Sequence, residues 1–339
     1  MRRLFLKACS AAAAGLLFKA CGGGNSDGTA AVGTGGGGTG GGSGGGGGGS
    51  APGSLLQLVQ QDNRFSALRD AAGKAGLQAT LDGVGTTLTL FAPENGAFDA
   101  LGARLGLGDR NGLIAGLSAQ QLADILRFHL VPRLLSSADL SALGAPGGDR
   151  PATLFSFGGD AAVLIFVANS SSLNIWDGVG RSSITLTSTD APASNGVLHV
   201  VSDVLLPRHV LTVSQMLRAS IDTFANYSAS LTPAIIAELD GSGPFTVFAP
   251  SNNAVTGLLS ADAVRHHATR QLLGGDDFPP SPTTLPLTML IGQQVTLSRD
   301  GTALATLRSG TTSQASVTDV DFFASNGVIH TIDQVLAPQ

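Results

Sequence analysis

The spacing of hydrophobic and polar positions changes twice along the chain. Apolar residues recur at helical spacing over residues 55–72 and again over residues 213–237, which predicts a helical region at each place. Further along, short runs rich in Val, Ile and Thr predict β-strands over residues 162–167, 182–189, 294–297 and 315–320. Helices followed by antiparallel strands, twice over, predict an α+β fold.

Two segments of the chain occur twice, in the same order. Residues 89–98 read TLFAPENGAF and residues 246–255 read TVFAPSNNAV. Residues 194–199 read SNGVLH and residues 325–330 read SNGVIH, and each is followed by a Val-Leu-x-Pro sequence. Self-similarity of this kind indicates a tandem duplication. We therefore divide the folded part into a first repeat, residues 51–208, and a shortened second repeat, residues 209–339.

The first motif predicts a strand that turns into a helix. Residues 86–91 are rich in Thr and apolar side chains and predict a strand, which Pro93 ends because proline cannot donate a ladder hydrogen bond. Polar residues at the next two positions suit a helix start. The residues of this structural corner are Phe91, Pro93, Asn95 and Phe98 in the first repeat and Phe248, Pro250 and Asn252 in the second.

The second motif contains Asn-Gly, which is the strongest short hairpin signal. Asn195-Gly196 and Asn326-Gly327 are therefore predicted to form type I′ turns. The aliphatic run over residues 197–206 predicts a buried strand pair. His199 and His330 lie in this apolar setting without a carboxylate or second His at metal-binding spacing, so we interpret them as core residues.

These segments resemble the hallmark motifs of the fasciclin family, which read approximately T-V-F-A-P-T-N-x-A-F and N-G-V-I-H-V-I-D-x-V-L-x-P. The resemblance covers both repeats, from about residue 54 to the end of the sequence. It implies that each domain is a wedge of two small β-sheets with helices packed at one edge. It also implies an adhesive or matrix-binding role.

The family has a weaker Tyr-His site between its two motifs. The matching positions here are Phe128-His129 and His266-His267, and the resemblance makes them candidate partner-binding residues. Pro93 and His129 are 36 positions apart, whereas Pro250 and His267 are 17 apart. The second repeat is shorter in the segment that carries a predicted capped helix after Ser118. The first repeat is therefore the better candidate for partner binding.

The first 20 residues predict an export signal. Their basic start, short apolar stretch and small residue before Cys21 are typical of a signal peptide, and Arg2, Arg3, Phe5, Leu6 and Lys7 match the twin-arginine consensus. The segment before Cys21 resembles a lipobox, which makes Cys21 the predicted lipidation site. Residues 22–50 contain 18 of the 47 glycines, so residues 21–50 are predicted to form a lipid-anchored, flexible tether.

Charge and composition exclude several classes of function. Without the export signal, 15 basic residues face 24 acidic residues, a net charge of about −9. Such a field would repel a phosphate backbone, which argues against nucleic acid as a partner. Both cysteines lie within the first 21 residues, so the folded part has no disulfide and no cysteine metal site.

No recognised catalytic, phosphate-binding or metal-binding motif occurs outside the low-complexity tether, so we predict no enzyme activity, no cofactor and no metal. Two functions remain open. The first is a surface-anchored adhesion lipoprotein of the bacterial cell envelope, whose partner is a cell-surface or matrix protein or polysaccharide. The alternative is a carrier of a small apolar ligand. In both cases the membrane is contacted through the lipid anchor only.

Overall fold

The computed structural model describes residues 53–83, 85–145, 148–168, 173–181, 184–299 and 304–339. The predicted export signal, Cys21 and the tether lie outside these residues. The helices of the first repeat are α1 (Leu55–Gln61), α2 (Ser66–Lys74), α3 (Gln78–Asp82), α4 (Asn95–Arg104), α5 (Arg110–Gly116), α6 (Ala119–Phe128) and α7 (Ser137–Leu143), with the 3-10 turn η1 (Asn63–Phe65). Its strands are β1 (Leu88–Pro93), β2 (Leu130–Val131), β3 (Ala152–Phe157), β4 (Asp160–Val163), β5 (Ile165–Ala168), β6 (Leu173–Trp176), β7 (Ile184–Ala193) and β8 (Gly196–Val201).

The second repeat follows the same order with fewer helices. Its helices are α8 (Val213–Ala219), α9 (Ile221–Ser228), α10 (Pro233–Leu239) and α11 (Ala261–Arg265), with the 3-10 turn η2 (Gly275–Asp277). Its strands are β9 (Phe245–Pro250), β10 (Ala268–Thr269), β11 (Thr284–Thr288), β12 (Gln294–Ser298), β13 (Ala305–Ser309), β14 (Ser313–Ala324) and β15 (Gly327–Ile332). The predicted α+β class is confirmed in both repeats.

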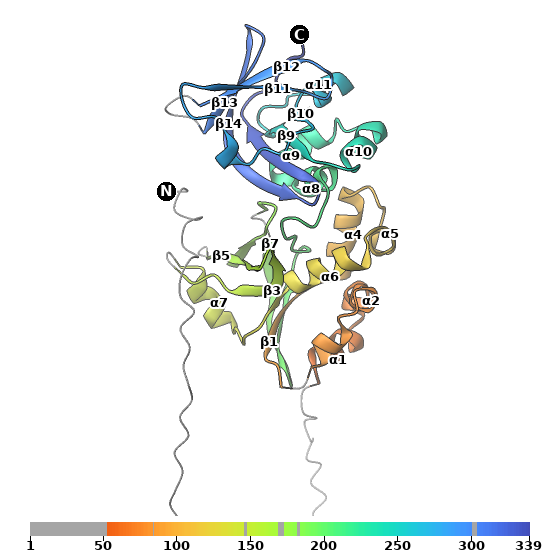
Figure 1. Cartoon of the computed structure of the whole chain (residues 1–339). Helices are drawn as coiled ribbons and strands as arrows, with labels where there is room; N and C mark the ends of the chain where they lie inside the picture. Colours follow the sequence, from red (N-terminus) through yellow and green to blue (C-terminus); the bar gives the residue numbers. More distant parts are fainter. Residues whose placement is uncertain (1–52, 84, 146–147, 169–172, 182–183, 300–303) are drawn as a thin grey trace, which may run out of the picture. The chain divides into compact units, whose positions relative to one another are not determined.

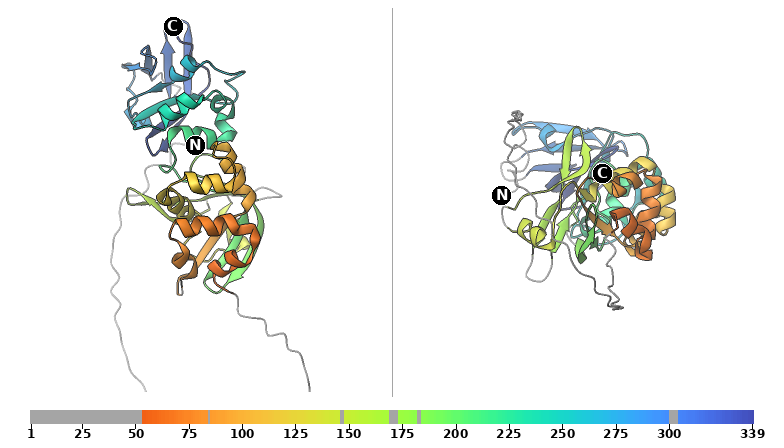
Figure 2. Two further views of the ribbon diagram at one scale, coloured as in Figure 1. Left: turned by 90° about the vertical axis from the view of Figure 1, so that its right-hand side faces the viewer. Right: turned by 90° about the horizontal axis from the view of Figure 1, so that it is seen from below.

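The predicted helical regions are present but broken into short helices. Ser54 starts α1 and Thr212 starts α8, each through a capping box in which its side chain accepts the N–H of a Gln three residues later. In the first repeat Asp62 ends α1 and begins η1, because its carboxylate accepts the N–H of Arg64. The helices α1, α2, α4, α5 and α6 lie on one side of β1 (Figures 1 and 2).

Each sheet is built around one parallel pair of strands. The strand order is β2-β1-β8-β7-β6-β5 in the first repeat, with β3-β4 as a separate pair, and β10-β9-β15-β14-β13-β12-β11 in the second. The pairs β1–β8 and β9–β15 are parallel, whereas the other ladders are antiparallel. The predicted strand pair over residues 197–206 is wrong, since this run supplies the single buried strand β8 and a segment that follows it.

The first motif forms the predicted strand, but its asparagine has another role. Strand β1 includes Pro93, and α4 begins at Asn95 without a side-chain cap. The Asn95 amide instead accepts the N–H of Ala67 at 2.9 Å and donates to the carbonyl of Asn63 at 2.8 Å, so it joins the corner to α2 and η1. Asn252 makes the matching bonds to α9, although no helix follows it directly.

The Asn-Gly pairs do not form the predicted type I′ turns. Ala193 pairs with Gly196, so the turn residues are Ser194 and Asn195, and neither has a positive φ. The Asn195 amide accepts the N–H of Leu55 at 2.9 Å and donates to the carbonyl of Leu81 at 3.0 Å. Asn326 makes the corresponding bonds to Val213, at 2.9 Å, and Leu239, at 2.8 Å. Each asparagine therefore fastens the first helix of its repeat to the sheet.

The glycines are required by the close approach of the parallel strand. A Cβ on Gly196 would lie 1.9 Å from the carbonyl oxygen of Leu88, its partner in β1. A Cβ on Gly327 would lie 2.3 Å from the carbonyl oxygen of Phe245, its partner in β9. Both distances are far below van der Waals contact, so any larger residue must push the two central strands apart.

Replacing Gly196 by Ala is therefore expected to lower the free energy of unfolding by about 3 kcal/mol, because the added methyl group overpacks the β1–β8 contact. Urea unfolding measures the loss. Gly96→Ala in α4 is the matched control, since a Cβ there meets no atom within 4 Å. Equal stabilities of the two variants would contradict this explanation of the glycine that both repeats have at this position.

Candidate functional site

Each repeat has two buried histidines, and each of them has an equivalent in the other repeat. Every one of these four rings joins two backbone segments by hydrogen bonds. His129 follows α6, where its Nδ1 lies 2.8 Å from the carbonyl of Ile125 and its Nε2 accepts the N–H of Leu205 at 2.9 Å. His267 follows α11 and makes the same pair of bonds, to Ala263 at 2.6 Å and Leu336 at 2.9 Å. Because a carbonyl only accepts, both rings carry their proton on Nδ1.

His199 and His330 join a strand bulge to a loop. The Nε2 of His199 donates to the carbonyl of Leu135 at 2.7 Å, and its Nδ1 accepts the N–H of Asp190 at 3.2 Å. His330 bonds Leu273 at 2.7 Å and Asp321 at 3.3 Å in the same way. These two rings therefore carry their proton on Nε2. The first motif supports them, since the rings of Phe91 and Phe248 pack against His199 and His330 at centroid distances of 5.7 and 5.4 Å.

Burial keeps these histidines neutral. Loss of hydration lowers the pKa of His129 and of His267 to about 4, and it also lowers the pKa of His199 and His330. A proton on the accepting nitrogen would break one of the two backbone bonds that each ring makes. The four rings are therefore structural bridges in their neutral form.

The residues of the predicted Tyr-His site are inaccessible. Phe128 is 1% exposed, and His129, His266 and His267 are each 0% exposed. The Phe128 ring packs edge-on against Phe155 at a centroid distance of 6.4 Å. In this structure these side chains offer no surface to a partner. Their burial therefore argues against the predicted partner contact, which stays a prediction.

His266 and Ser309 form a contact that superficially resembles a nucleophile with its base. The Nε2 of His266 lies 2.8 Å from Oγ of Ser309, and that hydroxyl donates its proton to the carbonyl of Ala337 at 2.8 Å. The histidine must therefore be the donor to Ser309, which is the reverse of the proton transfer that activates a serine. Ser309 is also only 2% exposed.

A buried ion pair lies near the end of the first sheet. Arg181 and Asp177 contact each other at 2.6 Å, with side chains 1% and 0% exposed. Both oxygens of Asp177 are occupied, one by the backbone N–H groups of Val179 and Arg181 and the other by the Arg181 guanidinium and the N–H of Leu206. This carboxylate has no free direction for a substrate, so we interpret the cluster as a structural one.

The loop after β2 is fastened so that one leucine points outward. Oγ1 of Thr89 donates to the carbonyl of Arg133 at 2.6 Å and accepts the N–H of Leu135 at 2.9 Å. His199 holds the carbonyl of Leu135 from the other side. The residue between these anchors, Leu134, is 57% exposed. In the second repeat, Thr246 and His330 fasten the equivalent loop, and Leu272 is 54% exposed.

A surface groove with a volume of about 510 Å³ lies beside Leu134 in the first repeat. Its lining residues come from the end of β7, the start of β8 and the segments before β1 and α7; they are Gly85, Thr86, Thr87, Leu134, Ser136, Asp190, Pro192, Ala193, Ser194, Asn195, Gly196 and Val197. Asp190 has a φ of 60°, a strained value for a residue other than glycine. Hydrogen bonds from Ser137 lower the pKa of its exposed carboxyl.

This groove is the candidate functional site. Of its lining residues, Asn195 and Gly196 are among the predicted motif residues, whereas Leu134, Asp190 and Pro192 belong to no predicted site. An outward leucine in a loop cannot be distinguished from a core leucine by periodicity alone. Exposed apolar side chains beside a charge are typical of binding surfaces, so we place the candidate site in this groove and not at the buried Tyr-His positions.

One apolar cavity in the core of the first repeat is too small for a carried ligand. A cavity lined by Leu68, Leu77, Leu81, Leu90, Leu126 and Leu130 has a volume of about 10 Å³. This is about the space of one water molecule, whereas ligand pockets measure several hundred Å³.

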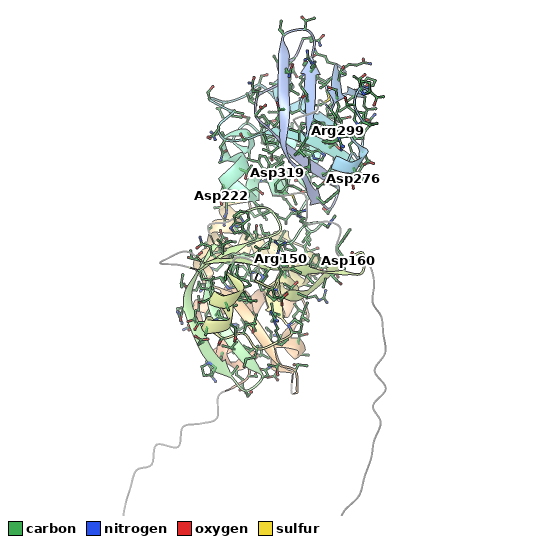
Figure 3. The ribbon with its side chains drawn as sticks, turned by 90° about the vertical axis from the view of Figure 1, so that its left-hand side faces the viewer. Arg150, Asp160, Asp222, Asp276, Arg299 and Asp319 are labelled. Atoms are coloured by element: carbon green, nitrogen blue, oxygen red, sulfur yellow. The ribbon has the colours of Figure 1, made fainter. Side chains whose placement is uncertain are left out.

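The described residues contain no group of three or more His, Cys, Asp or Glu side chains that could hold a metal ion. The acidic residues Asp222, Asp276 and Asp319 of the second repeat come from α9, η2 and β14 (Figure 3).

Over the part of the chain that the structure describes, no helix combines the length and apolar character needed to cross a membrane.

Comparison with known proteins identifies the family of this chain. The fasciclin domain model matches residues 63–207 and 220–338, so the chain belongs to the fasciclin family and contains two tandem fasciclin domains. The FAS1 domain pair of the insect cell adhesion molecule fasciclin I aligns over 83% of this chain and 95% of its own, with a TM-score of 0.37 and 16% sequence identity.

Curated relatives share part of the chain. The transforming growth factor-beta-induced protein ig-h3 of Sus scrofa is 36% identical over 155 residues, which are 46% of this chain and 19% of the relative. Human periostin is 25% identical over 281 residues, covering 77% of this chain and 29% of periostin. The Synechocystis protein sll1483 is 30% identical over 45% of this chain and 73% of its own length. The aligned part is thus about a fifth of ig-h3.

The lowered histidine pKa values make folding stability depend on pH. The unfolded chain binds protons near the ordinary histidine pKa of about 6.5, whereas folded His129 and His267 bind them near pH 4. Their contribution is complete above pH 6.5 and is lost as the pH falls toward 4. Between pH 7.5 and 5 we expect a loss on the order of 2 kcal/mol per histidine in urea unfolding. A stability that stays level over this range would contradict the neutral bridges.

Proposed function

We propose that this chain is a surface-anchored adhesion lipoprotein that binds a cell-surface or matrix protein or polysaccharide through the groove of its first repeat. The observation that carries the proposal is the groove itself, in which buried hydrogen bonds hold the loop that carries the exposed Leu134. The carboxylate of Asp190, which comes from β7, accepts the N–H of Ser137 beside it. A rigid, half-apolar surface of this kind limits the entropy lost on binding. Membership of the fasciclin family supports the same role, because the resemblance to that family implies adhesion.

The amino-terminal segment completes the proposal. Twin-arginine export followed by lipidation of Cys21 would hold the chain at the cell envelope. A Gly-rich coil of 29 residues spans about 30 Å on average, enough to lift the domains clear of the lipid headgroups. A tethered adhesion domain gains effective concentration near its partner, so moderate affinity suffices.

Replacing Leu134 by Asp is expected to reduce adhesion about tenfold or more, because it removes an apolar contact at the groove and puts a hydrated carboxylate in its place. The full chain is displayed on bacteria that lack it, and the cells that attach to surfaces coated with cell-surface or matrix extract are counted.

Leu272→Asp is the matched control, since Leu272 has almost the same exposure at the equivalent position of the second repeat. It should retain adhesion. Cys21→Ser should abolish both labelling with palmitate and retention at the envelope. The proposal fails if Leu134→Asp cells, displaying equal amounts of protein, adhere as well as wild-type cells, or if both leucine variants lose adhesion equally.

A further inference from the structure

The two repeats differ in what occupies the groove. Pro192 pairs with Val197 in the first repeat, and Phe323 pairs with Val328 in the second, so the two residues are equivalent by strand register. Pro192 is exposed and lines the groove, whereas Phe323 is half-buried.

The ring of Phe323 lies where the groove of the first repeat is open. Its Cζ lies 3.8 Å from the position of a Cβ on Gly274, so the ring extends over that residue. Gly274 is the equivalent of Ser136, because Leu273 and Leu135 are the loop residues bound by His330 and His199. Ser136 and Pro192 both line the groove of the first repeat. The second repeat therefore fills this space with an aromatic ring from its own strand.

The ring in the second repeat is supported by the segment that enters it. His209 stacks on Phe323 at a centroid distance of 5.1 Å and donates its backbone N–H to the Phe323 carbonyl at 2.8 Å. Arg208 donates to the carbonyl of Asp321 at 3.0 Å. The N–H of Ser325 donates to the carbonyl of Leu211, and the N–H of Ser194 donates to the carbonyl of Gly53. Leu211 and Gly53 are therefore equivalent positions at the start of the two repeats.

By this register, the first repeat has Ser50 and Ala51 in the sequence where the second has Arg208 and His209. Neither residue carries a ring or a charge. The sequence before the first repeat therefore has no aromatic or cationic residue at these two positions.

We propose that the groove of the first repeat receives an aromatic side chain from a protein partner, in the place that Phe323 takes in the second repeat. This inference rests on the adhesive function proposed above and names the chemistry of its ligand. Leu134 supplies an apolar wall, and His199 holds the backbone of Asp190 at the groove. Aromatic side chains are the commonest anchors of protein interfaces because they bury a large area at little entropic cost.

The charge of the groove refines the ligand. Asp190 is the only ionisable residue among those that line it, and its carboxylate is exposed. A cationic residue next to the aromatic one is favoured there by charge complementarity. An anionic polysaccharide would be repelled by the same carboxylate.

The test uses capped tripeptides as probes and the full chain, labelled with ¹⁵N, in solution. Ac-Arg-Phe-Gly-NH₂ is expected to cause saturable NMR shifts at the amides of Leu134, Ser136 and Val197. Ac-Arg-Leu-Gly-NH₂ should bind about fivefold more weakly, because it lacks the ring. A third probe, Ac-Gly-Phe-Gly-NH₂, lacks the cation and should bind the wild-type chain more weakly than Ac-Arg-Phe-Gly-NH₂. In the Asp190→Asn variant the two probes should bind with equal affinity.

Pro192→Phe copies the second repeat and should fill the groove from within, abolishing the shifts while the melting temperature stays within a few degrees. Leu134→Ser, at an exposed position, is a second variant that should weaken probe binding even if Pro192→Phe does not fold, because it removes the apolar wall without adding a charge. Absent shifts, equal binding of the Leu and Phe probes, or undiminished binding by folded Pro192→Phe would each overturn the inference. Shifts caused by a neutral tetrasaccharide but not by the Phe probe would overturn it in favour of a sugar ligand.

The adhesion assay distinguishes this inference from the function on which it rests. If Leu134→Asp cells lose adhesion while the Phe probe does not bind, the adhesive function stands and the aromatic ligand is wrong. If Leu134→Asp cells adhere normally, the adhesive function of the groove is wrong whatever the probes show.

Discussion

Both repeats depend on buried histidines that connect backbone segments which share no strand ladder. His199 joins the bulge at Asp190 to the loop at Leu135, and His330 does the same in the second repeat. Each ring satisfies one donor and one acceptor that would otherwise be buried without a partner, at a cost of about 1–3 kcal/mol each. A ring can make both bonds only when it is neutral. The positions of Asp190 and of the Leu135 loop at the groove therefore depend on the protonation state of His199.

This shared frame lets the two repeats differ at the surface without a change of fold. In the first repeat, Pro192 leaves the groove open, while Phe323 covers the equivalent place in the second. Helices also differ, since α6 has 10 residues and its counterpart α11 has 5. The loop that carries Leu134 is nevertheless held by the same Thr and His bonds as the loop that carries Leu272. The two copies of a duplicated domain can thus keep one fold while their surfaces diverge.

The sequence predicts the family, the tandem duplication and the α+β class, because motifs of several residues constrain local structure strongly. It does not predict how the motif residues are used. Asn195 and Gly196 are read as a turn because that is their local preference, but tertiary contacts use the amide to fasten α1 and the missing Cβ to admit β1. The groove is missed for the same reason, since the exposure of Leu134 results from hydrogen bonds to Thr89 and His199, which are distant in sequence.

The most direct test of this account is the ¹⁵N–¹H NMR spectrum of the imidazole rings at pH 6. The bridges predict that His129 and His267 are neutral with the proton on Nδ1, and that His199 and His330 are neutral with the proton on Nε2. Four slowly exchanging rings in these two tautomer classes would support the account. Protonated rings, or averaged shifts that indicate free exchange between tautomers, would contradict it.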